Sequence, residues 1–160
     1  DAVELGATAG IRSVVVTGPL LSASRQAELS VRSERLASVE MIEFSEHMRS
    51  LIASAAGVIS MAGYNTVVEE LAAGTPALLV PRREPRLEQE IRARRLAPHT
   101  ALEHCPIEQL EAARVARFVS SCVASAPSHP TSLDLTGAAT VASLLSPIRQ
   151  GRREREPAYA

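Results

Sequence analysis

The chain has 160 residues, enough for one domain with a sizeable core, and its net charge of -1 creates no global field for a polyanionic partner. Aromatic residues make up only 2% of the sequence. This composition argues against nucleic-acid modules that stack bases on aromatic side chains, and it predicts a core of Ala, Val, Leu and Ile. No apolar run approaches the length of a membrane span, and the two cysteines, Cys105 and Cys122, lack metal-ligand spacing.

Four runs of β-branched or alternating apolar residues predict strands, and the segments between them predict helices. Strands that alternate with helices indicate βαβ units, whose strands pair in parallel. We therefore expect an α/β domain, a Rossmann-like parallel sheet with helices on both faces. The expected strands are 13–17, 39–44, 57–60 and 77–80, and the expected helices are 22–36, 46–55, 66–73, 87–96, 107–124 and 137–149.

Composition divides the chain into three parts. The alternating pattern occupies residues 1–124, which we expect to form the domain. Residues 125–149 are expected to be a Pro/Ser-rich linker and a C-terminal helix, and the charged residues 150–160 a disordered tail. Asp1 is not a natural start, so we expect the natural N-terminus to lie upstream.

The carboxyl edge of the predicted sheet is where we expect a ligand, because ligands of open parallel sheets bind outside the carboxyl ends of the strands. Three predicted loops reach that edge, at 44–48, 60–66 and 81–89, and they hold most of the unusual residues of the chain. The sequence contains no Ser/His/Asp or Cys/His arrangement and no Walker loop. The catalytic residue is therefore unassigned.

The middle loop leads into a helix and has the residues for a phosphate site. Gly63 lets a ligand approach the backbone, and the free N–H groups and dipole of the helix N-terminus favour an anion. Asn65 and Thr66 add side-chain donors, and Glu69 is placed to accept hydrogen bonds from ribose hydroxyls. Thr66-x-x-Glu69 is also a capping box, and spacing alone favours that alternative.

Glu88 and Gln89 open the helix that follows the third loop. A carboxylate beside an amide can bind several sugar hydroxyls, but acidic residues are also common in a first helical turn, and spacing alone favours the second explanation. The arginines nearby indicate either a solvated helix face, the usual explanation, or a basic patch for nucleic acid or anionic lipid. They are Arg82, Arg83, Arg86, Arg92, Arg94 and Arg95.

The stretch ISMAGYNTVVEELAAGTPALLVPRREPRLEQEIRARRL, residues 59–96, resembles the C-terminal, donor-binding domain of GT-B glycosyltransferases. The general relative is the bacterial enzyme that adds N-acetylglucosamine to the lipid-linked peptidoglycan precursor. The chain is more similar to a group of predicted bacterial glycosyltransferases with a Gly-Tyr-Asn-Thr loop, a Glu three residues after the Thr, and a Pro-Arg…Glu-Gln…Arg-Ala segment. It departs from that group at Ala62, where Gly is usual.

The resemblance implies that each of the three loops binds part of a nucleotide sugar, and the long composite motif favours these roles over helix capping. The implied donor-binding residues are Phe44, Ser45 and Met48 for the base, Gly63, Tyr64, Asn65 and Thr66 for the diphosphate, Glu69 for the ribose, and Glu88 and Gln89 for the donor sugar.

The resemblance further implies that the parent protein moves a sugar from a nucleoside-diphosphate donor, expected to be a UDP-sugar, to a hydroxyl acceptor. It implies no metal or other cofactor, because GT-B enzymes stabilise the leaving diphosphate with helix dipoles and side chains. The catalytic base is expected in an N-terminal acceptor domain of the same parent chain. The glycine-rich loop that precedes the domain's first helix is absent, so the first strand of the fold is expected to be missing from the chain.

Two other functions stay open at this stage. The chain is also compatible with a sugar-nucleotide epimerase of the same fold, or with a noncatalytic module that uses the arginines to bind nucleic acid or membrane. If the protein is a glycosyltransferase, no nucleic-acid partner is expected. The expected location is the cytoplasm, with peripheral membrane contact left open.

Overall fold

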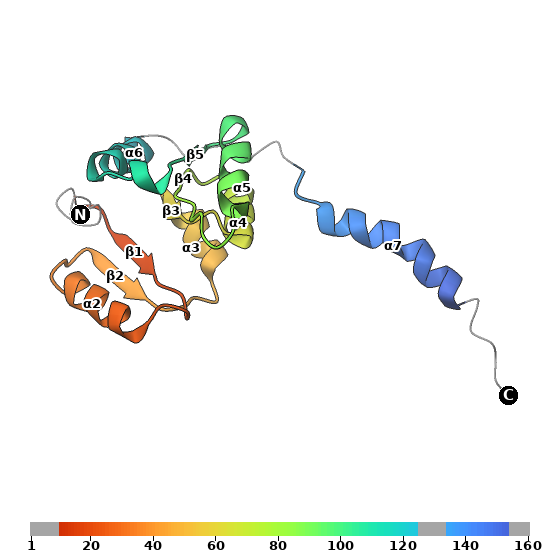
Figure 1. The fold of residues 1–160 in the computed structure, drawn as a ribbon, viewed down its shortest axis with the longest axis horizontal. Helices are drawn as coiled ribbons and strands as arrows, with labels where there is room; N and C mark the ends of the chain where they lie inside the picture. Colours follow the sequence, from red (N-terminus) through yellow and green to blue (C-terminus); the bar gives the residue numbers. More distant parts are fainter. Residues whose placement is uncertain (1–9, 125–133, 154–160) are drawn as a thin grey trace.

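The computed structural model describes residues 10–124 and 134–153, and the expected linker at 125–133 and the end of the tail at 154–160 lie outside the described residues. In chain order the elements are β1 (Ser13–Val16), α2 (Ala23–Ser33), β2 (Val39–Ile42), α3 (Met48–Ser54), β3 (Val58–Ser60), α4 (Tyr64–Ala73), β4 (Ala77–Leu79), α5 (Glu88–Leu96), η1 (Ala97–His99), β5 (Leu102–His104), η2 (Ile107–Gln109), α6 (Ala112–Ala124) and α7 (Gly137–Arg153) (Figure 1).

The strands pair in parallel and are flanked by helices, which confirms the expected α/β class. They form two sheets in the described part of the chain, one of order β1-β2 and one of order β3-β4-β5. Four strands in one sheet were expected, so both the count and the single sheet are corrected. The additional strand, β5, pairs with β4 in the register Ala77↔Leu102 and Leu79↔His104.

Strand β4 is the centre of the core, because all three of its residues are buried. Alternate residues of a strand point to opposite faces of the sheet, so β4 packs against helices on both sides. Ala77 and Leu79 belong to the cluster on the side of α4 and α5, and Leu78 belongs to the cluster on the side of α6. The first cluster is Ala62, Val67, Leu71, Ala77, Leu79, Ala93 and Leu102, and the second is Leu78, Val80, Cys105, Val115, Phe118 and Cys122.

Several helix boundaries differ from the sequence prediction: α2 ends at Ser33 rather than at 36, and α3 begins at Met48 rather than at 46. Helix α4 begins at Tyr64 rather than at 66, and α6 begins at Ala112 rather than at 107, because the short helix η2 and two further residues precede it. Helix α7 continues to Arg153, past the expected end at 149. It extends away from the rest of the chain (Figure 1), and its residues 137–146 are all exposed.

Ala62 has a backbone conformation that is unusual for a residue with a side chain. Its φ is +60°, and it is completely buried. Its carbonyl oxygen accepts a hydrogen bond of 2.7 Å from Nη1 of Arg92, which holds this conformation from a helix thirty residues away. A left-handed conformation costs a non-glycine residue about 1–2 kcal/mol, which the surrounding core must offset.

We expect Ala62→Val to destabilise the fold by about 2 kcal/mol or more, because a β-branched residue tolerates positive φ poorly and the added methyl groups have no room in the core. Urea unfolding measures the change. Ala101→Val is the matched control: Ala101 is exposed and has no positive φ, so its substitution should change stability by less than about 0.5 kcal/mol. Equal effects of the two substitutions would refute this account of Ala62.

Glu70, on α4, is a buried carboxyl group whose charge has no compensation. Its side chain is fully buried, and neither carboxyl oxygen has a hydrogen-bond partner in the described part of the chain. Burial raises the pKa of Glu70 from 4.5 to about 7, the nearby Ser60 hydroxyl lowers this pKa in part, and the charge of Glu69 raises it further. The folded state therefore holds the proton more tightly than the unfolded state does.

We expect the free energy of unfolding to fall as the pH rises from about 4.5 to about 7, because the unfolded state binds fewer protons than the folded state over that interval. The contribution of Glu70 to this fall is about 3 kcal/mol. Glu70→Gln removes the charge and should lose this part of the pH dependence. Glu69→Gln is the control and should retain most of it, because the charge of Glu69 contributes less to the raised pKa than burial does. Identical pH dependence of the wild type and Glu70→Gln in urea unfolding would contradict the assignment.

Candidate functional site

The N-terminus of α4 carries no side-chain cap, and space is open beside it. Gly63 is the N-cap residue, with φ -58° and ψ 145°, a conformation that any residue adopts. A Cβ atom at Gly63 would meet only Oγ1 of Thr66, at 3.7 Å, so packing does not require a glycine here. By contrast, the side chain of Ser22 caps α2. The first N–H groups of α4 are thus available to an anion.

The capping-box explanation for Thr66 and Glu69 is wrong. Helix α4 begins at Tyr64, so Thr66 is its third residue and not its cap. Glu69 is half-buried in the second turn, three residues after Thr66, so the two side chains lie on the same side of the helix. Among the described residues, no hydrogen bond or ion pair holds the carboxylate of Glu69, which leaves it able to accept hydrogen bonds from a ligand.

Arg92 connects the loop before α4 to α5. Besides its hydrogen bond to the carbonyl oxygen of Ala62, its guanidinium lies 5.4 Å from the ring centroid of Tyr64, a cation–π contact. Sequence analysis placed Arg92 only in the arginine cluster and missed this role, because the contact spans thirty residues. The one available signal was that Arg92 belongs to the composite motif.

The adjacent residues Glu88 and Gln89 have different environments. Glu88 begins α5 and is exposed, whereas Gln89 is buried and its Oε1 accepts a hydrogen bond of 3.2 Å from the backbone N–H of Arg82. Gln89 therefore fixes the loop between β4 and α5. The structure brings the middle of α5 close to the loop before α4 through Arg92, but it does not present Glu88 and Gln89 as a pair.

The first predicted loop, 44–48, follows β2, which belongs to the other sheet. The ring of Phe44 is 68% exposed, and Oγ of Ser45 accepts a hydrogen bond of 3.1 Å from the backbone N–H of His47. Met48 is the first residue of α3 and is half-buried, and α3 packs against α4. The loop is thus connected to the α4 site through a helix–helix contact.

Large apolar side chains are exposed in these loops and at the start of α4. Exposed apolar side chains that gather in one region can cover a ligand or an adjoining domain. Sequence analysis did not single out two of them, Met61 and Leu87. The set is Phe44, Met61, Tyr64 and Leu87, each more than half exposed.

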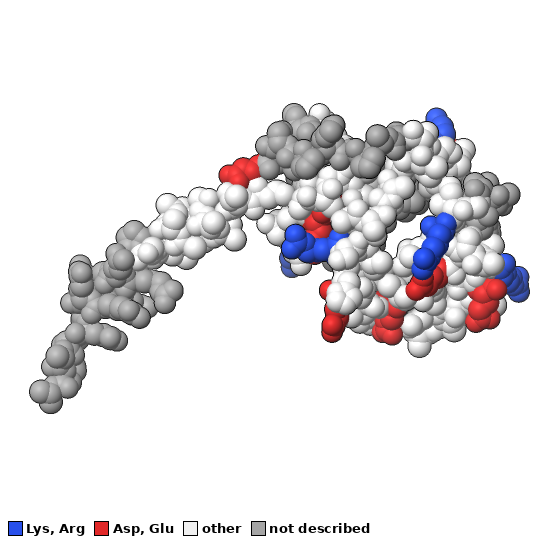
Figure 2. Space-filling model, turned by 180° about the vertical axis from the view of Figure 1, so that it is seen from behind, with Lys and Arg blue, Asp and Glu red and all other residues white. Residues whose placement is uncertain are grey.

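Two of the six clustered arginines are engaged with neighbouring groups. Arg92 is engaged with Ala62 and Tyr64, and Arg83 forms an ion pair of 3.2 Å with Glu108, whose pKa is lowered by hydrogen bonds from its own backbone and from Arg83. On the face shown in Figure 2, basic and acidic side chains are interspersed. The described residues show no group of three or more metal-ligating side chains. No described helix is long and apolar enough to cross a membrane.

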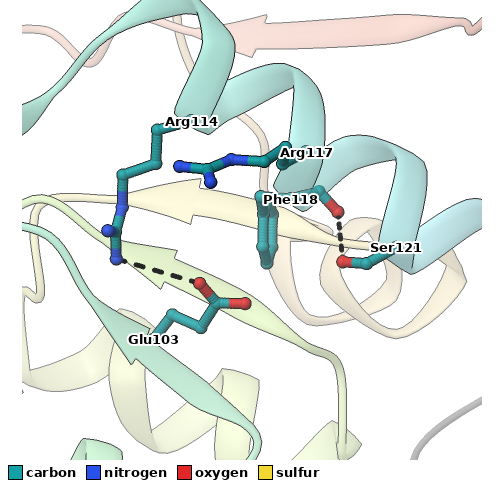
Figure 3. Close-up of a pocket in the computed structure, with 5 residues that line it drawn as sticks. All are labelled: Glu103, Arg114, Arg117, Phe118 and Ser121. Carbon is teal, nitrogen blue, oxygen red and sulfur yellow. Dashed lines mark hydrogen bonds and ion pairs between the residues drawn. The ribbon is translucent and has the colours of Figure 1, made fainter.

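A cavity of about 350 Å³ lies between β5 and α6 (Figure 3). Arg114 faces Glu103 across it at 3.9 Å, and Oγ of Ser121 donates a hydrogen bond of 2.7 Å to the carbonyl oxygen of Phe118. None of the sequence-predicted site residues lines it. Arg117 also lines the cavity, so it holds one guanidinium that faces Glu103 and one without an ion-pair partner among the described residues.

Known proteins were compared with the chain. Among the solved structures that share its fold, two match with a TM-score of 0.61. One is the glycosyltransferase VinC in complex with dTDP, which is 22% identical, and the match covers 78% of this chain and 29% of that one. The other is the glycotransferase of kitacinnamycin, which is 18% identical, and the match covers 96% of this chain and 34% of that one. The chain thus spans about a third of their length. No curated protein sequence matches it.

The sequence profile of the glycosyltransferase family 28 C-terminal domain matches residues 7–143. This range includes the parallel sheets, the open N-terminus of α4 and the start of α5. The match agrees with the resemblance found in residues 59–96. The chain therefore belongs to the glycosyltransferase family 28 C-terminal domain family.

Proposed function

We propose that this domain binds the nucleoside diphosphate of a sugar donor at the N-terminus of α4, and that the protein to which it belongs transfers the sugar to a hydroxyl acceptor. The observation that carries the proposal is the uncapped N-terminus of α4 with open space at Gly63. This site lies at the carboxyl end of β3, where parallel sheets bind their ligands. Membership of the family supports the transfer reaction.

The diphosphate would bind to backbone donors and the helix dipole. The first-turn N–H groups, those of Tyr64, Asn65 and Thr66, point out of the helix end, and the dipole adds a partial positive charge there. Asn65 is exposed and Thr66 half-exposed, so their side chains can add hydrogen bonds. The same groups would stabilise the charge that develops on the leaving diphosphate, with no metal in the proposed mechanism.

The nucleoside would lie beside α4, with Glu69 accepting hydrogen bonds from ribose hydroxyls and the loop of Phe44, Ser45 and Met48 near the base. The Glu69 carboxylate has no hydrogen-bond or ion-pair partner among the described residues, which supports its role in this proposal. We propose UDP as the nucleotide. The solved structure of VinC contains dTDP, which is also a pyrimidine nucleoside diphosphate and which supports a base of this class.

The donor sugar would contact the start of α5. Glu88 is exposed there and can accept hydrogen bonds from sugar hydroxyls, while Gln89 acts by holding the loop at Arg82 in place. The acceptor and the catalytic base would come from another domain of the parent protein, since transfer needs both reactants held in one geometry.

We expect Gly63→Asp to separate binding from stability. An aspartate at the N-cap accepts hydrogen bonds from the first turn, so the free energy of unfolding should stay the same or rise by a few tenths of a kcal/mol. The carboxylate occupies the diphosphate site and repels the diphosphate, so affinity for UDP should fall about tenfold or more. NMR titration with UDP measures the affinity.

Gly63→Ala is the control for this substitution, because a methyl group there meets only Thr66 at an ordinary distance. It should retain most of the affinity for UDP. Unchanged UDP binding by Gly63→Asp in a folded sample would remove the diphosphate from the N-terminus of α4.

We expect Glu69→Gln to weaken UDP binding about tenfold, because a neutral amide replaces a carboxylate that accepts charge-assisted hydrogen bonds. The loss should be smaller for dUDP, which lacks the 2′-hydroxyl. Thermal stability should hardly change, because Glu69 does not cap the helix. The same titrations measure both nucleotides, and Glu111→Gln, at an exposed position on the approach to α6, is the control. An equal loss for UDP and dUDP would rule out recognition of the 2′-hydroxyl by Glu69.

A further inference from the structure

The cavity between β5 and α6 lies on the face of the sheet opposite to the α4 site. Leu78, at the centre of β4, packs with residues of α6, whereas Ala77 and Leu79 pack with residues of α4. Glu103 is in register with Leu78, and its side chain lines the cavity. The cavity is therefore separate from the nucleotide site, and its volume of about 350 Å³ is within the range of small-molecule sites.

One side of α6 supplies most of the cavity lining. Arg114, Arg117 and Ser121 are separated by three and four residues, so they lie on one side of the helix, with Phe118 beside them. Figure 3 shows these side chains on the part of α6 that faces β5. Two like charges one helical turn apart weaken a helix, and an anion that contacts both replaces this repulsion with attraction.

The two guanidinium groups share one carboxylate. Oε2 of Glu103 lies 3.9 Å from Nη2 of Arg114, which is beyond hydrogen-bond distance, and the side chain of Glu103 is 52% exposed. The same Nη2 donates a hydrogen bond of 3.1 Å to the carbonyl oxygen of His104, which holds Arg114 beside the end of β5. Elsewhere Arg12 and Arg83 contact carboxylates at 2.7 and 3.2 Å. Glu103 therefore neutralises Arg114 only in part.

Both arginines keep donors that the protein does not use. Nε of Arg114 is shielded from solvent and has no hydrogen-bond partner in the described part of the chain. Arg117 is exposed, and it makes no hydrogen bond or ion pair with any residue that the structure describes. A guanidinium has five N–H donors in a fixed fork, which matches the oxygen atoms of carboxylates and phosphates. The cavity thus offers two guanidinium groups with donors to spare.

The number of acceptor oxygens distinguishes between these two kinds of anion. A carboxylate has two oxygen atoms and pairs with one guanidinium fork, whereas a phosphate monoester has three terminal oxygens and can accept hydrogen bonds from two arginines at once. The charge of the monoester at pH 7, about −1.5 to −2, also matches that of two guanidinium groups. The chemistry of the lining therefore favours a phosphate group.

We propose that the cavity between β5 and α6 is an anion site, which binds the phosphate group of a small phosphate monoester between Arg114 and Arg117. Arg117 is the main ligand, because the protein engages none of its donors. Glu103 opposes the anion, since a carboxylate repels a phosphate, and its exposed side chain is free to turn toward solvent. The proposal does not depend on the nucleotide site, which lies on the other face of the sheet.

An NMR titration with inorganic phosphate at constant ionic strength tests the proposal. We expect shifts of the Nε–H signal of Arg117 and of the backbone amides of Glu103, Arg117 and Ser121. Arg117→Gln should weaken this binding about tenfold or more, because it removes charge-assisted hydrogen bonds. Glu103→Gln should strengthen the binding about threefold, because it removes a like charge beside the anion.

Arg94→Gln is the matched control. Arg94 is an exposed arginine of α5, which packs on the other face of the sheet, so its substitution should leave these shifts unchanged. The amides of the first turn of α4 report the nucleotide site separately, so a failure of one site is distinguishable from a failure of the other. Shifts confined to α4, or equal phosphate affinity of Arg117→Gln and the wild type, would overturn the proposal. Weaker phosphate binding by Glu103→Gln would overturn it as well.

A lipid headgroup can also supply a phosphate group, and a second measurement distinguishes this source. The chain is sedimented with vesicles of phosphatidylcholine, with and without phosphatidic acid. We expect no binding that depends on both phosphatidic acid and Arg117. Binding that depends on both, without the shifts expected for inorganic phosphate, would assign the cavity to a membrane lipid and would overturn the small monoester as its ligand.

Discussion

The burial of β4 on both faces is the constraint on which the arrangement of the site depends. Helices α4 and α5 close one face of this strand and α6 closes the other, so polar loops have no place except the ends of the strands. The N-terminus of α4 follows the carboxyl end of β3 after residues 61–63, and that of α5 follows the carboxyl end of β4 after residues 80–87. Because the core fixes where these helices start, an anion site at a helix end is a consequence of packing.

The hydrophobic core and the candidate binding site are adjacent in the sequence. Ala62 is completely buried in the cluster beside α4, and Gly63, the next residue, faces open space. The hydrogen bond from Arg92 to the carbonyl oxygen of Ala62 fixes the turn between them. A change in the core at this point moves the first turn of α4, so stability and ligand recognition are coupled through the backbone of a single loop.

The sequence predicts the fold class and the three loops well, because apolar periodicity and strand ends are local signals. It misses β5, whose three residues, Leu102, Glu103 and His104, include two polar side chains and are too few for a period to show. It also places the start of α4 two residues late, because Thr66 followed by Glu69 imitates a capping box, whereas the true N-cap residue, Gly63, has no side chain to cap the helix. Tertiary contacts such as those of Arg92 and Gln89 join distant residues, and no single sequence reveals them.

The separation into two sheets has a consequence for cooperativity. The unit of β1, α2 and β2 contains no buried residue. Both core clusters lie in the unit built on β4, which includes α6 and the loops around it. Local opening costs least where few apolar contacts are lost, so the first unit should open without the second. Probes on Val15 and on Leu78 should then report different transitions, and the free energies of unfolding discussed for Ala62, Gly63 and Glu70 refer to the unit built on β4.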